Sequence, residues 1–339
     1  MKLSSVFARA LDQRLLEQHP PLLQYLLQVG DTPLTKVPGP GNGARVFAKC
    51  EWTNPTGVKD RAVFGMVYRE LKKTPLARRG GLHILEYTGG SLGMALSRLC
   101  AQLGLHLTLV LSGATDPAVV AEMRGHGSKV ILVPRERGFW GVMETAHGLA
   151  AENPTWRFLF QHENPANIWM HRETTGREVA EQLPYDSADG PCAWIASIGT
   201  GATLIGVYSA LIQKIPQLQL FATTPAELPY GSEFAPNGLP KFLGSGGLGC
   251  GRKQPFVAAV ESRIMGHLHY TYEDALRGMR EFCGRTGLRI GSSAAANWLA
   301  ACKVAERLGP QATVVTVFPS AATEYEWAKA QSVPAAGAA

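Results

Sequence analysis

Short apolar runs alternate with segments of helical periodicity along almost the whole chain. Runs with the length of a strand lie at Leu82 to Tyr87, Leu107 to Leu111 and Val130 to Val133, and the segments between them repeat apolar residues at helical spacing. Strands that alternate with helices in this way favour parallel sheets joined by right-handed crossovers. We therefore predict an α/β protein in which ligands gather at the C-terminal ends of the strands.

The same alternation continues in the second half of the chain. It predicts strands at 157–160, 193–197, 218–223 and 313–318, and helices at 167–183, 204–215 and 292–308. With 339 residues, the chain is long enough to bury a large core and to divide into two lobes. The residues from 333 to 339 are small and predict a disordered tail.

Composition gives no support to several classes of protein. The net charge is +6, but the basic residues are scattered, so nothing supports a nucleic-acid surface. No segment is long and apolar enough to span a membrane, and the N-terminus has no apolar signal region. The six cysteines lie far apart without metal-ligand spacing, which indicates reduced thiols in a cytoplasmic protein and no metal site.

The stretch from Glu51 to Arg61 gives the strongest chemical signal. It breaks a short apolar strand with Asn54-Pro55 and Gly57 and leads into a helix, so Lys59 lies at a strand-to-helix turn. The helix N-terminus disfavours a second cation there, and burial would also lower the pKa of the lysine and supply a neutral amine for Schiff-base chemistry. The alternative is a surface lysine paired with Asp60 or a neighbouring carboxylate.

A second signal is the loop Gly199-Thr200-Gly201-Ala202-Thr203, between an apolar strand and a helix. Small residues let several backbone N–H groups point at one anion, and the helix N-terminus adds a favourable field. The loop is therefore a candidate phosphate site, and a plain tight turn is the alternative.

Asn54-Pro-Thr-Gly-Val-Lys-Asp-Arg61 resembles the lysine motif of the tryptophan synthase β / cysteine synthase superfamily, the fold-type-II pyridoxal-phosphate enzymes. That family usually has a serine before the position of Val58, and this chain lacks it. Further segments match in the same order from about Leu27 to Trp327. The resemblance implies a two-lobed fold, each lobe a mostly parallel twisted sheet flanked by helices. Residues 1–49 and 151–339 would form the large cofactor domain, and 50–150 a small mobile substrate-side domain.

The resemblance also implies roles for single residues. Lys59 would hold pyridoxal 5'-phosphate as an internal aldimine. Gly199, Thr200, Gly201, Ala202 and Thr203 would bind its phosphate, with Ala202 replacing a family glycine, which is tolerable if its φ is negative. Ser292 would face the pyridine nitrogen and leave it largely neutral, which favours β-elimination; without the resemblance, Ser292 is the N-cap of the next helix.

On the substrate side, the resemblance implies that the turn Thr88-Gly89-Gly90-Ser91-Leu92 binds the substrate carboxylate with backbone amides, assisted by Gln161. Ser91 stands where the family has an asparagine that contacts the cofactor ring oxygen, so this contact would be weaker, water-mediated or missing. The alternative is a structural turn with Ser91 as N-cap. The glycine-rich segment 244–251 resembles one that lines the family's active site, and a flexible surface loop is its alternative.

The activity implied by the resemblance is β-replacement on O-acetylserine or O-phosphoserine through an aminoacrylate. The nucleophile would be sulfide, a thiol or an amine, and the enzyme a homodimer. The departures at Val58, Ser91 and Ala202 indicate a specialised paralogue. The alternatives are a serine or threonine dehydratase, which releases the aminoacrylate to water, and a catalytically silent homologue that binds partners or cofactor.

Overall fold

The computed structural model describes residues 7–232 and 246–334. Of the tail predicted at 333–339, all but Val333 and Pro334 lies outside these ranges. The chain forms two compact units: unit 1 contains Met1–Asp31 and Asn54–Met170, and unit 2 contains Thr32–Thr53 and His171–Ala339. No helix within the described ranges is long and apolar enough to cross a membrane.

Unit 1 is built on a four-stranded parallel sheet with the strand order β5-β4-β3-β6. Its strands are β3 (His83–Tyr87), β4 (His106–Ser112), β5 (Lys129–Val133) and β6 (Arg157–Phe158). Its helices are α2 (Gln13–Gln18), α3 (Pro20–Gln28), α4 (Lys59–Lys73), α5 (Leu76–Arg79), α6 (Ser91–Leu103), α7 (Pro117–Gly125), α8 (Gly138–Glu152) and α9 (Pro165–Met170), with a 3₁₀ turn at Arg135–Arg137.

Helices cover both faces of this sheet, because alternate strand residues point to opposite sides. Ile84 and Leu109 belong to a large apolar cluster with α3, α4 and α6, whereas Leu85 and Val110 belong to a smaller cluster with α8. The N-terminal helices contribute Leu15 and Leu22, among others, to the larger cluster. They are therefore part of unit 1, whereas the sequence placed residues 1–49 with the residues after 150.

Unit 2 is built on a six-stranded sheet with the order β1-β2-β10-β7-β8-β9, in which only the edge pair β1–β2 is antiparallel. Its strands are β1 (Leu34–Val37), β2 (Arg45–Cys50), β7 (Cys192–Ser197), β8 (Gln219–Pro225), β9 (Ile264–Tyr270) and β10 (Thr313–Phe318). Its helices are α10 (Arg177–Gln182), α11 (Ala202–Leu211), α12 (Pro255–Ala258), α13 (Tyr272–Thr286), α14 (Ser292–Leu308) and α15 (Glu324–Ser332), with a π-helical segment at His171–Gly176 and 3₁₀ turns at Glu51–Thr53, Tyr185–Ala188, Gly246–Leu248 and Glu261–Arg263.

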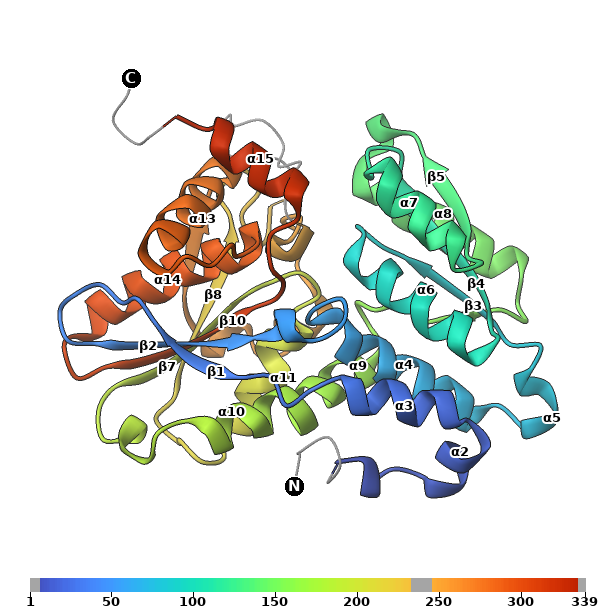
Figure 1. Cartoon of the computed structure of the whole chain (residues 1–339), viewed down its shortest axis with the longest axis horizontal. Coiled ribbons are helices and arrows are strands. Elements are labelled where there is room, and N and C mark those ends of the chain that lie inside the picture. Colours follow the sequence, from blue (N-terminus) through green and yellow to red (C-terminus); the bar gives the residue numbers. More distant parts are fainter. Residues whose placement is uncertain (1–6, 233–245, 335–339) are drawn as a thin grey trace. The chain divides into compact units, whose positions relative to one another are not determined.

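Two apolar cores enclose this sheet as well. Ala193 and Ile195 of β7 pack with α13 and α14, and Trp194 of the same strand packs with α11 on the other face. Figure 1 labels β7 and these three helices. The prediction of an α/β protein with mostly parallel sheets flanked by helices is confirmed. Strands β1 and β9 were not predicted, and the prediction of one helix at 167–183 is wrong, because this segment consists of α9, the π-helical segment and α10.

Candidate functional site

Lys59 is the first residue of α4, in unit 1. The turn before it contains Gly57 with a φ of +98°, a conformation that favours glycine. The Asp60 carboxylate is fully engaged elsewhere: it accepts hydrogen bonds from the Tyr25 hydroxyl at 2.5 Å, from the Thr56 hydroxyl at 2.7 Å and from the Thr56 backbone N–H at 2.6 Å. Lys59 forms no ion pair with Asp60, so that alternative for the lysine is wrong.

The environment of the Lys59 amine favours its neutral form. Desolvation by the surrounding protein lowers the pKa of this lysine. Within residues 7–232 and 246–334, the amine has no hydrogen bond or ion pair that would offset this loss of hydration. A neutral amine is the form that can attack a carbonyl carbon or accept a proton.

The turn after β3 presents backbone donors at the start of α6. Gly90, with a φ of +141°, is the N-cap residue, and the Thr88 hydroxyl accepts hydrogen bonds from the N–H groups of Gly90 at 3.0 Å and Gly93 at 3.2 Å. The N–H groups of Ser91 and Leu92 keep no partner among the described residues, as expected in a first helical turn. Two adjacent free donors suit a carboxylate.

The exposed Ser91 is the first helical residue, so the alternative that made it the N-cap is wrong.

Gln161 lies beside this turn because β6 pairs with β3. It is buried, and its side-chain amide donates a hydrogen bond to the Tyr87 carbonyl at 2.7 Å, one residue before Thr88. The structure therefore brings Gln161 and the Thr88 turn together at the C-terminal end of β3. The side-chain NH₂ of Gln161 has a second N–H besides the one bonded to Tyr87, and such an N–H can donate to a carboxylate.

A buried glutamate, Glu86, forms hydrogen bonds that hold the end of β3 and Gln161 together. Glu86 accepts hydrogen bonds from the backbone N–H groups of Tyr87 at 3.0 Å and Gln161 at 3.1 Å, and thereby links β3 to the segment after β6. Burial raises the pKa of Glu86 to about 8, although these hydrogen bonds oppose the rise. Sequence reasoning missed this residue, and the available signal was a lone carboxylate within an apolar strand.

In unit 2, the loop Gly199 to Thr203 joins β7 to α11. Gly201 is the N-cap residue with a φ of +87°, and a Cβ atom at this position would lie 2.4 Å from Cγ2 of Val257, so only glycine fits. Ala202 is the first helical residue and is not among the positions with positive φ. The condition for replacing the family glycine by Ala202 is therefore met. The Thr200 hydroxyl accepts a hydrogen bond from the Ala202 N–H at 3.2 Å.

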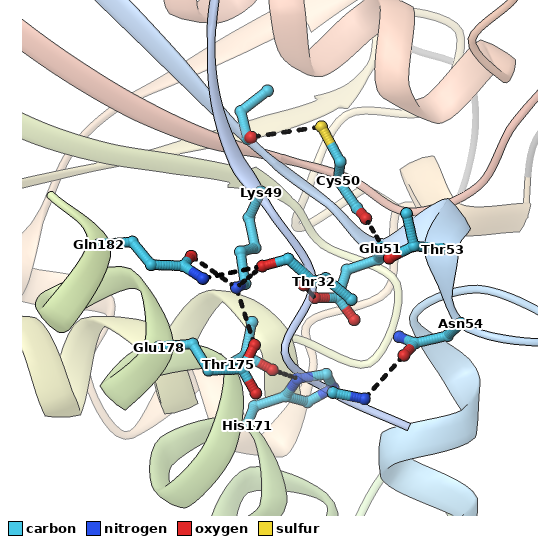
Figure 2. Close-up of polar contacts among 12 residues, drawn as sticks. Thr32, Lys49, Cys50, Glu51, Thr53, Asn54, His171, Thr175, Glu178 and Gln182 are labelled. Carbon is cyan, nitrogen blue, oxygen red and sulfur yellow. Dashed lines mark hydrogen bonds and ion pairs between the residues drawn. The ribbon is translucent and has the colours of Figure 1, made fainter. Parts of the chain in front are cut away.

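The last residue of this loop is held by a histidine that sequence reasoning missed. The Thr203 hydroxyl lies 3.1 Å from Nε2 of His171. Nδ1 of the same ring lies 3.0 Å from the Thr175 hydroxyl (Figure 2). His171 and Thr175 belong to the π-helical segment, a rare conformation that is frequent at functional sites. Regular helical periodicity across 167–183 concealed it.

Part of the glycine-rich segment 244–251 packs on the same loop. Gly249 has a φ of +100°, and a Cβ atom there would lie 2.2 Å from the carbonyl oxygen of Ile198, directly before Gly199. This close approach makes 246–251 a packed element, so the alternative of a flexible surface loop is wrong for these residues. Gly244 and Ser245 lie outside the described residues.

Ser292 is the first residue of α14, and the N-cap is Gly291 without a side-chain capping bond. The alternative that made Ser292 a helix cap is therefore wrong. Its buried hydroxyl instead donates a hydrogen bond to Oε1 of Glu326, in α15, at 2.6 Å. Sequence reasoning missed Glu326, and nothing in its local sequence indicated this contact.

Several known proteins are similar to this chain. A family model described as pyridoxal-phosphate dependent enzyme matches residues 25–320. The chain is 31% identical over 303 residues to a probable cysteine synthase of Bacillus subtilis, covering 88% of this chain and 94% of the relative.

Two solved structures are also similar. The O-acetylserine dependent cystathionine β-synthase of Helicobacter pylori has a TM-score of 0.76 and 27% identity, covering 88% of this chain and 95% of that one. An O-ureido-L-serine synthase has a TM-score of 0.76 and 25% identity, covering 89% of this chain and 92% of that one.

Proposed function

Since the chain belongs to the family of pyridoxal-phosphate dependent enzymes, we propose that it catalyses β-replacement on an O-activated serine such as O-acetylserine or O-phosphoserine. The observation that carries this proposal is the Lys59 amine, which is desolvated and has no partner among the described residues. A desolvated amine without a partner destabilises the folded protein, and a catalytically silent homologue would have no reason to keep it. Relatives named for cysteine synthesis and for the use of O-acetylserine support the reaction class.

The residues of this chain fit the cofactor. Lys59 supplies a free amine for its aldehyde carbon, and Gly201, with its positive φ and close contact to Val257, shapes the turn that leads into the N-terminus of α11. We propose that the Gly199 to Thr203 loop binds the phosphate with its backbone donors and the field of the helix N-terminus. Ser292 would meet the pyridine nitrogen, and Ser91 would lie where the family places a ring-oxygen contact. When bound, pyridoxal phosphate withdraws electrons from the substrate Cα.

The chain's own residues then divide the remaining work. The N–H groups of Ser91 and Leu92 would bind the substrate carboxylate, and Thr88 keeps their turn rigid by accepting from Gly90 and Gly93. The Lys59 amine, once released by the substrate amine, would remove the proton from Cα. The β-substituent would leave with its bonding electrons, a nucleophile would add at Cβ, and Lys59 would return the proton to Cα to complete the replacement.

We propose that the second substrate is a small nucleophile, namely sulfide, a thiol or an amine. The similarity to a structure named O-ureido-L-serine synthase supports a choice wider than sulfide. We further propose a cytoplasmic homodimer in which residues 50–150 contain the mobile substrate-side domain and unit 2 the greater part of the cofactor domain. The changes at Val58, Ser91 and Ala202 support a specialised role.

The test is to mix the purified protein with O-acetylserine or O-phosphoserine and follow its visible spectrum. We expect a yellow protein whose absorption band shifts with one of these donors and returns when the correct nucleophile is added. Glycine, which has no β-substituent, is the control amino acid. A colourless protein that takes up no cofactor would indicate a silent homologue, and no shift together with keto-acid release from serine or threonine would indicate a dehydratase.

A further inference from the structure

Ser292, which is buried, and Glu326, which is half-buried, form a hydrogen-bonded pair in unit 2. The Ser292 side chain is 1% exposed, and its hydroxyl donates to Oε1 of Glu326 at 2.6 Å. This length is typical of a hydroxyl bound to a carboxylate, which is a stronger bond than one between two neutral groups. A carboxylate only accepts, so the single hydroxyl proton of Ser292 belongs to this bond.

The backbone fixes the pair although the two residues are far apart in sequence. Ile290 and Ala321 form a β-bridge, and the Gly291 N–H donates to the Ser320 carbonyl at 3.1 Å. These contacts join the segment before α14 to the segment before α15. The start of α15 is also fixed, because the Thr323 hydroxyl caps it by accepting from the Glu326 N–H.

Glu326 has no cation to neutralise it among the described residues. The nearby Arg289 pairs with Glu324 at 3.5 Å, and Lys329 lies over the rings of Tyr272 and Tyr325. Ser292 is therefore the side chain to which the Glu326 carboxylate is bonded. This hydrogen bond polarises the Ser292 hydroxyl and makes its oxygen more negative.

We propose that Glu326 acts through Ser292 to keep the pyridine nitrogen of the bound cofactor protonated. This inference rests on the proposed function, in which Ser292 meets that nitrogen. Because the hydroxyl proton is committed to Glu326, the Ser292 oxygen can offer the nitrogen only a lone pair. The nitrogen must then carry the proton and donate it, with the carboxylate behind the serine stabilising the resulting positive charge.

The consequence is a change in the electronics of the site. A serine alone would leave the nitrogen largely neutral, whereas a serine backed by a carboxylate behaves as an indirect carboxylate partner. The protonated ring is the stronger electron sink. Glu326 is thus a positioning residue that makes this chain differ from a site with an isolated serine.

The experiment is nitrogen-15 NMR of the full-length protein reconstituted with cofactor labelled at the pyridine nitrogen. We expect the wild-type signal in the range of a protonated pyridine. In Glu326→Gln, whose amide can donate to Ser292 and release the hydroxyl proton toward the ring, the signal should move to the range of an unprotonated pyridine. Glu324→Gln is the matched control, since it removes the same charge from the same helix turn without touching Ser292, and should leave the signal unchanged.

Two outcomes overturn the inference: an unprotonated nitrogen in the wild type, or a signal that does not respond to Glu326→Gln. If Glu326→Gln does not fold, the nitrogen-15 signal of the wild type still tests the inference, because an unprotonated nitrogen there contradicts it. Borohydride reduction and peptide mapping of the same sample separate the two proposals. Cofactor fixed on Lys59 with an unprotonated nitrogen overturns only the role of Glu326, whereas failure of the protein to attach cofactor overturns both.

Discussion

Lys49 and Lys59, ten positions apart in the sequence, have opposite surroundings in the two units. Lys49, at the end of β2 in unit 2, is fully buried and forms an ion pair with Glu178 at 2.7 Å. Its ammonium also donates to Oε1 of Gln182 at 2.9 Å and to the Thr32 carbonyl (Figure 2). Lys59, at the start of α4 in unit 1, has no such partner among the described residues.

The buried carboxylates Glu178 and Glu86 differ in the same way as the two lysines: one has a counter-ion and the other has none within the described ranges. Glu178 is balanced by Lys49, whereas Glu86 in unit 1 accepts only N–H donors and has a pKa raised to about 8. A buried charge that is paired keeps its ionised form and serves structure, and one that is desolvated without a counter-ion loses it. The ion pair with Glu178 therefore distinguishes Lys49 from Lys59, the lysine whose amine is available for chemistry.

The largest expected effect is that of Lys59→Ala. Loss of the amine removes both the covalent attachment and the base, and a general base alone contributes about 10²–10⁴-fold to a rate. We expect borohydride reduction to add the cofactor mass to the Lys59 peptide of the wild type and to no peptide of the variant, with turnover lost at least to that extent.

Exposed Lys72, in the same helix, provides the matched control, and Lys72→Ala should label and turn over like the wild type. Cofactor mass on the Lys49 or Lys72 peptide would show that Lys59 does not carry the cofactor, and would contradict the distinction between a paired and an available lysine.

The next effect concerns stability. Lys49→Met leaves Glu178 buried without a counter-ion, and removal of one partner from a buried pair costs about 3–5 kcal/mol. We expect chemical denaturation to show this loss in the free energy of unfolding, while the cofactor still attaches at Lys59. The double variant Lys49→Met/Glu178→Leu should recover part of the loss.

Lys36→Met, on the exposed face of the neighbouring strand β1, should change the free energy of unfolding by no more than about 0.5 kcal/mol. Equal effects of Lys49→Met and Lys36→Met would mean that the buried pair does not stabilise unit 2.

Much of the site could be predicted because local chemistry determines it. Gly201 needs a positive φ and a close approach, and the pattern of small residues in its loop reveals both. The residue types of Asn54, Pro55 and Gly57 likewise predict the strand-to-helix turn before Lys59. Where a few adjacent residues set the backbone, their types are enough.

The remaining features depend on contacts that a local pattern does not contain. Glu326 meets Ser292 only because a bridge between Ile290 and Ala321 aligns two distant segments. Strand β9 was missed because Gly266, His267 and His269 interrupt its apolar character, and pairing with β8 overrides this weak local preference. The engagement of Asp60 by Tyr25 likewise requires α3 to pack against α4.

The smallest expected effect is a change in the pH dependence of stability caused by Glu86. The pKa of Glu86 rises from an ordinary value of 4.5 to about 8 in the folded protein, so between these values the folded state holds a proton that the unfolded chain has lost. Raising the pH through this window therefore favours the unfolded state, by up to about 1.4 kcal/mol per pH unit. Glu86→Gln cannot titrate and should lack this contribution.

Denaturant unfolding at about pH 6 and pH 7 measures it: the wild type should lose about 1.4 kcal/mol more than Glu86→Gln over this interval. The slopes are compared rather than the absolute stabilities, because glutamine offers only one acceptor oxygen to the two N–H groups that Glu86 serves and so adds a cost that does not vary with pH. Glu122→Gln, at an exposed position of α7, should keep the wild-type slope. If Glu86→Gln also keeps that slope, Glu86 is ionised in the folded protein, and the contrast with Glu178 then fails for the carboxylates while it can still hold for the lysines.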